Sequence, residues 1–167
     1  MDIYVNTPTF EKLREGLKWM IAEAREVIEG PDGDWEPFLF VENDLTVVPR
    51  SLTEFVVETD EQKDYVAEVV IPEMVREARG HRAGLTFPAL IAAKPANDHT
   101  RDRYGAEVRY HEAVTLLVVD REHCELWLAP VERYPDRGPT LGPWFQLPAG
   151  AERRFVEPLR RAVCPQG

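Results

Sequence analysis

The chain has 167 residues, of which 44% are hydrophobic and 30% are charged, as expected for one folded domain and not for a disordered chain. Its 30 acidic and 20 basic residues give a formal net charge of -10, which argues against general nucleic-acid binding, because phosphate neutralisation needs a basic surface. Two cysteines, Cys124 and Cys164, are too few for a disulfide framework in a chain of this length.

The negative charge is concentrated in the first half of the chain. Residues 1–80 carry a net charge of -11, and residues 81–167 carry a net charge of +1. Either the folded molecule has an acidic face that meets a partner, or its surface helices are simply rich in glutamate and well solvated.

The first predicted element is a helix over residues 8–29. Its apolar residues follow the three-and-four spacing of one helical face. Thr7 can cap this helix with Pro8 at its first position, and Gly30-Pro31 ends it.

A strand pair and a second helix come next. Residues 38–41 and 45–48 are predicted to form a hairpin, and residues 54–58 a short third strand. Residues 60–79 are predicted to form a helix that starts with a capping box, Thr59 to Gln62. Pro72 lies inside this helix and is expected to kink or break it.

The second half has the pattern of β-structure. Residues 83–93 contain Pro88, which predicts an edge position or a bulge at that point. The continuous apolar run in 112–120 predicts a central strand, which forms a hairpin with residues 124–131. Residues 94–107 and 134–150 are expected to be irregular, and a short helix is expected near residues 157–163.

This order of elements predicts an α+β fold in a single domain covering 1–167. The expected architecture is a mainly antiparallel sheet of five to six strands, with two long helices packed on one of its faces and a short C-terminal helix. The connection through the second helix allows one parallel strand pair, and the strand order stays open.

The common catalytic signatures are absent. Ser51 is the only serine and does not lie in a Gly-x-Ser-x-Gly turn. Cys124 follows His123, but neighbouring residues of a strand point to opposite faces, so this adjacency does not indicate a catalytic dyad. No glycine-rich phosphate loop is present, and no cofactor is expected.

A metal site is conceivable in the long polar connection and the strand that follows it. Asp98, His99, His111 and Glu112 would hold a divalent cation if the fold brought them together. The alternative is that the four histidines of the chain are unrelated loop or surface residues.

Other residues suit binding to a protein. Arg101, Arg103 and Tyr104 share the long loop, and Trp144 and Phe145 lie in a segment rich in proline and glycine. Arginine beside aromatic residues is typical of interaction hot spots. The alternative for Trp144 and Phe145 is that they cover the edge of the core.

These observations favour a small acidic protein-interaction module, such as an inhibitor, an immunity-like protein or an adaptor, and they do not favour an enzyme. The expected partner is a basic protein or a second copy of the chain. A metal-dependent hydrolase or nuclease using residues 94–112 is the alternative, and mimicry of nucleic acid by an acidic helix is a weaker one.

The sequence shows no signal peptide or membrane span, so we expect a cytoplasmic protein. Its high arginine content suggests a bacterial or phage source.

Overall fold

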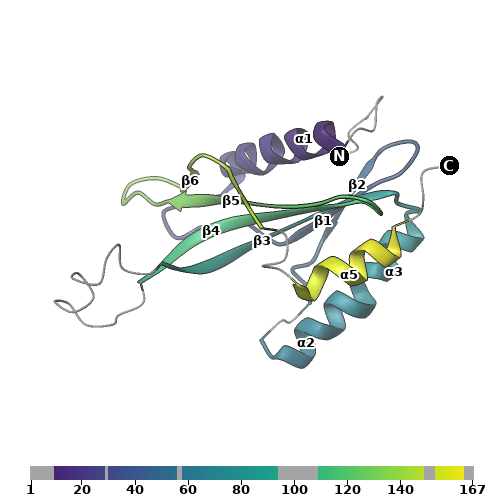
Figure 1. The fold of residues 1–167 in the computed structure, drawn as a ribbon. Helices are drawn as coiled ribbons and strands as arrows, with labels where there is room; N and C mark the ends of the chain where they lie inside the picture. The colour runs from purple at the N-terminus through teal and green to yellow at the C-terminus, as the bar shows by residue number, and fades with distance from the viewer. Residues whose placement is uncertain (1–9, 29, 56–57, 94–108, 149–152, 164–167) are drawn as a thin grey trace.

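A curled antiparallel sheet with the strand order β2-β1-β3-β4-β5-β6 forms the centre of the molecule, and β7 pairs with β5 beside β6. The structure is a computed structural model that describes residues 10–28, 30–55, 58–93, 109–148 and 153–163. The sheet and its helices confirm the predicted α+β class (Figure 1). The strands are β1 (Phe38–Glu42), β2 (Val47–Ser51), β3 (Arg82–Ala93), β4 (Arg109–Val119), β5 (Cys124–Glu132), β6 (Thr140–Leu141) and β7 (Phe145–Leu147).

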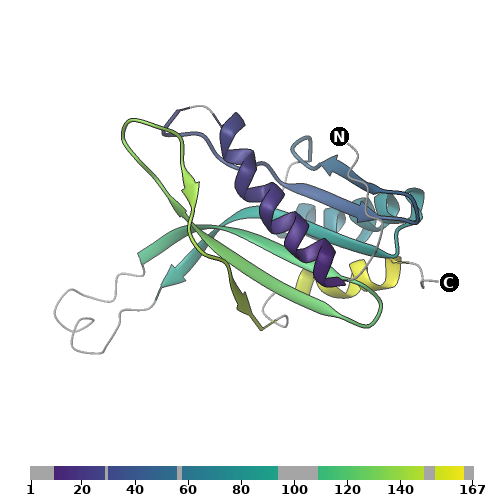
Figure 2. The same cartoon turned by 90° about the horizontal axis from the view of Figure 1, so that it is seen from above.

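Helices cover both faces of this sheet, so the expectation that they share one face is wrong (Figures 1 and 2). One face packs against α1 (Phe10–Glu23), which continues as the 3-10 turn η1 (Ala24–Val27). The other face packs against α2 (Asp60–Tyr65), the π-helical segment η2 (Val66–Val70), α3 (Ile71–Glu77) and α5 (Arg153–Ala162).

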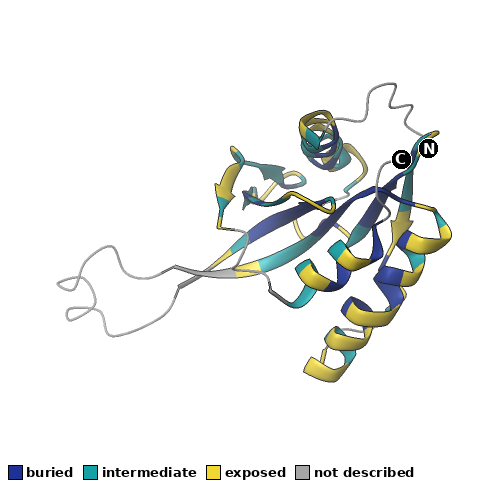
Figure 3. Ribbon diagram, turned by 45° about the vertical axis from the view of Figure 1, so that its right-hand side comes forward, coloured by how far each residue is buried: buried dark blue, intermediate teal, exposed yellow. Residues whose placement is uncertain are grey.

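The reason for two covered faces lies in the central strands, which are apolar on both sides. In β4, Leu117 and Val119 join the core cluster under α3 and α5, whereas Leu116 and Val118 join the cluster under α1. Figure 3 shows these central strands as buried. An unbroken apolar run is typical of a strand with both faces buried, and it needs a helix on each side.

All strand pairs are antiparallel, including β1 with β3, between which the second helix lies. The crossover therefore creates no parallel pair. The β4–β5 hairpin is confirmed. The pairing of β3 with β1 ends at Thr86, and the rest of β3 pairs with β4 alone. This confirms the edge position predicted at Pro88.

The second predicted helix is present, and a π-helical segment lies directly before Pro72. The capping box is present, because Thr59 Oγ1 accepts from Gln62 N at 3.2 Å and Gln62 Oε1 accepts from Thr59 N at 3.0 Å. Pro72 follows the π-helical segment η2 and lies in the first turn of α3. A π segment changes the backbone hydrogen-bond ladder, and such segments are a recognised cause of helix bending.

Several predictions of local structure are wrong. Residues 134–150 were expected to be irregular, yet they contain the short strands β6 and β7, which pair with β5. The second strand of the first hairpin lies at 47–51, because the Asn43 side chain accepts from the backbone of Leu45 and Thr46 and holds them in the turn. Of the predicted third strand, 54–55 and 58 form a turn and bends, and 56–57 lie outside the described residues. The last helix begins at Arg153, with Pro158 inside it.

Candidate functional site

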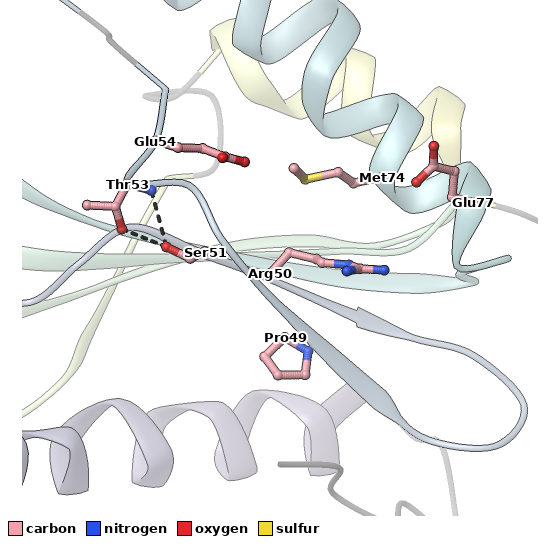
Figure 4. A pocket seen from close by; sticks show the side chains of 7 residues that line it. All are labelled: Pro49, Arg50, Ser51, Thr53, Glu54, Met74 and Glu77. Carbon is pink, nitrogen blue, oxygen red and sulfur yellow. Dashed lines mark hydrogen bonds between the residues drawn. The ribbon is translucent and has the colours of Figure 1, made fainter.

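Two adjoining pockets lie where β2 and the following turn face the second helix. The first has a volume of about 540 Å³ and is lined by Pro49, Arg50, Ser51, Thr53, Glu54, Met74 and Glu77 (Figure 4). The second, of about 340 Å³, is lined by Glu54, Phe55, Glu61, Gln62, Tyr65 and Val66. Because Glu54 lines both pockets, we treat them as one site and call it the acidic groove.

The turn after β2 forms one wall of the acidic groove. Leu52 is buried and donates its N–H to Pro37 O at 2.9 Å, which anchors the end of β2 to the chain that precedes β1. The Ser51 and Thr53 hydroxyls lie 2.6 Å apart, and Thr53 N donates to Ser51 Oγ at 3.3 Å. This local hydrogen bonding holds the turn in shape and leaves Glu54 exposed beside the helix.

The helix that forms the other wall is acidic. Asp60–Glu77 contains six acidic and two basic residues, a net charge of -4, whereas Phe10–Val27 contains four of each. Figure 3 shows exposed residues along the outer side of α2 and α3. The α2–α3 side of the sheet therefore carries part of the charge asymmetry of the sequence, and residues 28–59, between the two helices, carry a further net charge of -7.

The charged side chains of the acidic groove are not neutralised by ion pairs with other described residues. Its lining residues include three carboxylates, Glu54, Glu61 and Glu77, and one guanidinium, Arg50. In the part of the chain that the structure describes, none of these four makes an ion pair. The groove thus offers free carboxylates to a cationic group.

Apolar side chains accompany these charges. Tyr65 is 58% exposed and Val69, one helical turn later, is 40% exposed. Met74 contributes an apolar surface to the first pocket and Phe55 to the second. A large aromatic side chain left in solvent beside charged residues has the composition of a protein-binding hot spot.

The arginines near the C-terminus are partly used inside the molecule. Arg154 lies 3.2 Å from Asp60 and 3.0 Å from Asp64, so it fixes the start of the second helix to α5. Arg160 donates to Arg121 O at 3.2 Å. Asp60 and Asp64 are exposed but paired with Arg154, which leaves Glu61, Glu68, Glu73 and Glu77 as the exposed carboxylates of the helix without an ion pair among the described residues.

The two aromatic residues predicted to bind a partner, Trp144 and Phe145, differ in their burial. Trp144 is partly buried and packs against the core cluster under α1, and Phe145, on β7, is 47% exposed. Arg101, Arg103 and Tyr104 lie outside the described residues. Binding through these five residues stays a prediction.

The metal site also stays a prediction, because Asp98 and His99 lie outside the described residues. His111 and Glu112 are successive residues of β4, so their side chains point to opposite faces. Glu112 accepts hydrogen bonds from Arg133 Nε and from Arg133 Nη2, the latter at 2.8 Å. Among the described residues, no group of three or more metal-ligating side chains comes together.

The serine and the cysteine considered for catalysis have ordinary surroundings. Ser51 lines the first pocket, but its hydroxyl is paired with Thr53 and no histidine is among the described residues of that lining. Burial raises the pKa of the Cys124 thiol, which opposes formation of a thiolate. Cys164 lies outside the described residues.

Sequence reasoning missed a buried charged cluster at the end of the sheet. Glu42 is fully buried and accepts from Arg82 Nη1 at 2.7 Å, and His81 Nδ1 lies 3.6 Å from the same carboxylate oxygen. Glu42 Oε2 has no hydrogen-bond partner in the described part of the molecule. The sequence signal is a charged residue at the end of an apolar run. Glu42 directly follows the apolar residues 38–41, and Arg82 directly precedes the largely apolar stretch 83–87.

The acidic groove was also missed, because it forms only when the turn after β2 packs beside the second helix, and its first pocket joins residues 49–54 to Met74 and Glu77. The predicted strand ended at residue 48, so Pro49 was not recognised as part of an edge strand. Comparisons with protein-family models, with curated proteins and with solved structures found no match. No helix within the described ranges is long and apolar enough to cross a membrane.

Proposed function

We propose that this chain is a small acidic protein-interaction module that binds a basic segment of a partner protein in the acidic groove. The observation that carries the proposal is the combination, in one groove, of unpaired carboxylates with the exposed Tyr65, beside which Val69 is exposed one helical turn later. No comparable excess of acid lies on α1, where acidic and basic residues are equal in number.

The two kinds of side chain would contribute differently to binding. Exposed carboxylates attract and orient a basic partner, and they act mainly on the association rate and its dependence on salt. Tyr65 would supply contact area that is removed from water on binding, which is where most interface energy resides. We therefore expect an affinity that depends on both the charges and this aromatic residue.

A basic partner is favoured over a second copy of this chain. In a second copy, Arg154 of α5 is already paired with Asp60 and Asp64 of its own chain, so this guanidinium is not available to an acidic face. A cytoplasmic location remains our expectation and rests on the low cysteine count.

The experiment is affinity capture with the tagged chain from an extract of its source organism, followed by mass spectrometry and by rebinding of the purified partner. The variants are Tyr65→Ala and the double variant Glu61→Lys/Glu77→Lys. Trp19→Ala is the matched control, because Trp19 is 68% exposed on α1, across the sheet. Each variant is first checked for native circular dichroism.

The proposal predicts that both groove variants weaken binding by about tenfold or more and that the Trp19→Ala control does not. It also predicts weaker binding when the salt concentration rises from about 50 mM to about 500 mM. Binding that is equal in all variants, or that does not respond to salt, would contradict it.

A further inference from the structure

The edge strand β2 presents one set of backbone groups that no other described strand takes. Strand β2 lies at one edge of the sheet, and among the described strands it pairs only with β1. Asn43 N donates to Thr46 O, and Leu52 N donates to Pro37 O, so the inward-facing positions alternate from 46 to 52. The backbone groups of 47, 49 and 51 therefore face away from β1.

This free edge offers an incomplete ladder. Val47 and Ser51 each present an outward N–H and an outward C=O, whereas Pro49 presents only a C=O. Val47 O also accepts a long hydrogen bond of 3.5 Å from its neighbour Thr46 Oγ1. A strand added here would make hydrogen bonds at both ends of β2 and would lack one donor at the centre. Such a pattern still permits pairing with an extended segment, and it disfavours indiscriminate pairing between edges.

The first pocket of the acidic groove lies beside the same edge. Pro49, Arg50 and Ser51 of β2 line it together with Met74 and Glu77 of α3. Figure 4 shows Arg50, Met74 and Glu77 on the side of the strand that faces α3, with Pro49 on the other side. An extended segment on β2 would direct alternate side chains toward α3, because side chains alternate between the two faces of a strand.

The chemistry of this pocket selects a basic side chain. Its two carboxylates, Glu54 and Glu77, exceed its one guanidinium, Arg50, by a single negative charge. One lysine or arginine would neutralise the pocket, with its aliphatic stem on Met74 and its charged head near the carboxylates.

We propose that the partner's segment binds in extended form, as an added strand on the free edge of β2, and places one basic side chain in the first pocket. This inference rests on the proposed function and specifies the form and chemistry of the bound segment. Backbone hydrogen bonds would contribute affinity, and the pocket would contribute selectivity.

The test does not need the natural partner. A displayed library of random eight-residue peptides is selected on the immobilised full chain, and the best peptide is synthesised in three further forms. Two forms carry N-methyl groups, one on the odd and one on the even backbone positions. The third replaces the basic residue by norleucine, which keeps the aliphatic stem and removes the charge. Affinities are measured by calorimetry.

We expect one N-methyl series to lose about tenfold or more in affinity and the other to lose little, because only alternate residues of an added strand face β2. We expect norleucine to weaken binding to the wild-type chain by about tenfold, and to have a smaller effect on the Glu54→Gln/Glu77→Gln variant. In isotope-labelled protein, the amide signals of Val47 and Ser51 should shift when the peptide is added.

Selection of no peptide, selection of peptides without a basic residue, or equal losses in the two N-methyl series would overturn the inference. A failure here is distinguishable from failure of the proposed function. If the natural partner still depends on Tyr65 and Glu61, the groove binds a protein but not as an added strand; if it depends on neither, the proposed function itself fails.

Discussion

At the scale of single residues, the most heavily buried charge in the described structure is Glu42, paired with Arg82. Burying an ion pair costs desolvation energy that its attraction only partly offsets, so such a pair is weak evidence for stability. Its geometric role is clearer. The two residues are register partners on β1 and β3, and mispairing these strands by one residue would leave both charges buried without a partner.

Arg133 has a different role, because it joins segments that are distant in the sequence. Beyond its contact with Glu112, Arg133 Nη1 donates to Pro31 O at 2.9 Å and to Gly33 O at 2.8 Å. The hydrogen bonds from Arg133 lower the pKa of Glu112, against the opposing effect of partial burial. This depressed pKa makes a prediction about stability and pH.

A carboxyl group whose pKa is lowered by folding stabilises the folded state above its unfolded pKa, and this contribution is lost as the pH falls through its folded pKa. We expect Glu112→Gln to reduce the free energy of unfolding at pH 7 and to have almost no effect at pH 3. The loss should stay below about 1 kcal/mol, because the Glu112 side chain is 41% exposed. Urea denaturation between pH 3 and pH 7 measures it.

Glu26→Gln is the control for this series, since Glu26 is exposed on η1 and makes no ion pair with another described residue. A loss at Glu112 that does not change with pH would contradict the role given to Arg133.

At the scale of elements, α1 is attached to its face of the sheet by close packing and by polar contacts. Arg14 Nη1 lies 2.9 Å from Glu125 Oε1, Lys18 Nζ lies 3.2 Å from the centre of the Trp127 ring, and Trp35 Nε1 donates to Ile21 O at 2.8 Å. Gly84 lets the helix approach, since a Cβ at that position would lie 2.3 Å from Leu17 Cδ1.

Gly84→Ala is therefore expected to destabilise the fold by about 1–3 kcal/mol through overpacking against the buried Leu17. Leu17→Ala alone should cost about 2–5 kcal/mol. The double variant should cost less than the sum of the two, because the shortened side chain makes room for the new methyl group. Chemical denaturation of the four proteins measures this coupling.

Gly16→Ala on the exposed side of α1 is the matched control, because nothing lies within 4 Å of its Cβ position. It should be neutral or stabilise the helix by up to about 1 kcal/mol. Additive effects at positions 17 and 84 would show that the close approach does not matter.

Local sequence signals predicted the elements better than their arrangement. The Thr59–Gln62 capping box, the β4–β5 hairpin and the edge position at Pro88 depend on near neighbours in the chain, and they are confirmed. The placement of α1 across the sheet from α2 depends on which side of each strand is covered, and hydrophobic periodicity alone does not specify this. The acidic groove follows from that arrangement, so it was not predictable either.

At the scale of the whole molecule, the net charge of -10 has an uneven distribution with a structural basis. The helix over Asp60–Glu77 carries a net charge of -4 on one side of the sheet, α1 on the other side is balanced, and residues 28–59 between the two helices carry -7. Such an asymmetric molecule would approach a basic partner in a preferred orientation. Its solution behaviour also depends on the edge strand β2.

We predict that Pro49→Thr promotes self-association, because it restores an outward N–H on the free edge and completes the ladder that another copy could pair with. Sedimentation velocity from about 10 μM to about 500 μM should show a concentration-dependent increase in mass, with stability changed by no more than about 1 kcal/mol. Ser51→Ala adds no donor and should stay like the wild type. A Pro49→Thr protein that behaves identically to the wild type would show that this edge is shielded by other means.

The pairing of β1 with β3 also has a consequence for how the molecule folds. The other main pairings, β1–β2, β3–β4 and β4–β5, join strands that follow one another, whereas Glu42 and Arg82 meet across a separation of 40 residues. Closing a loop of this length costs chain entropy before its contacts form, which slows folding. Both β2 and α3 lie inside that loop, so the groove between them is completed only when the loop closes. We therefore expect the groove to form late in folding, in the same step that joins β1 to the rest of the sheet.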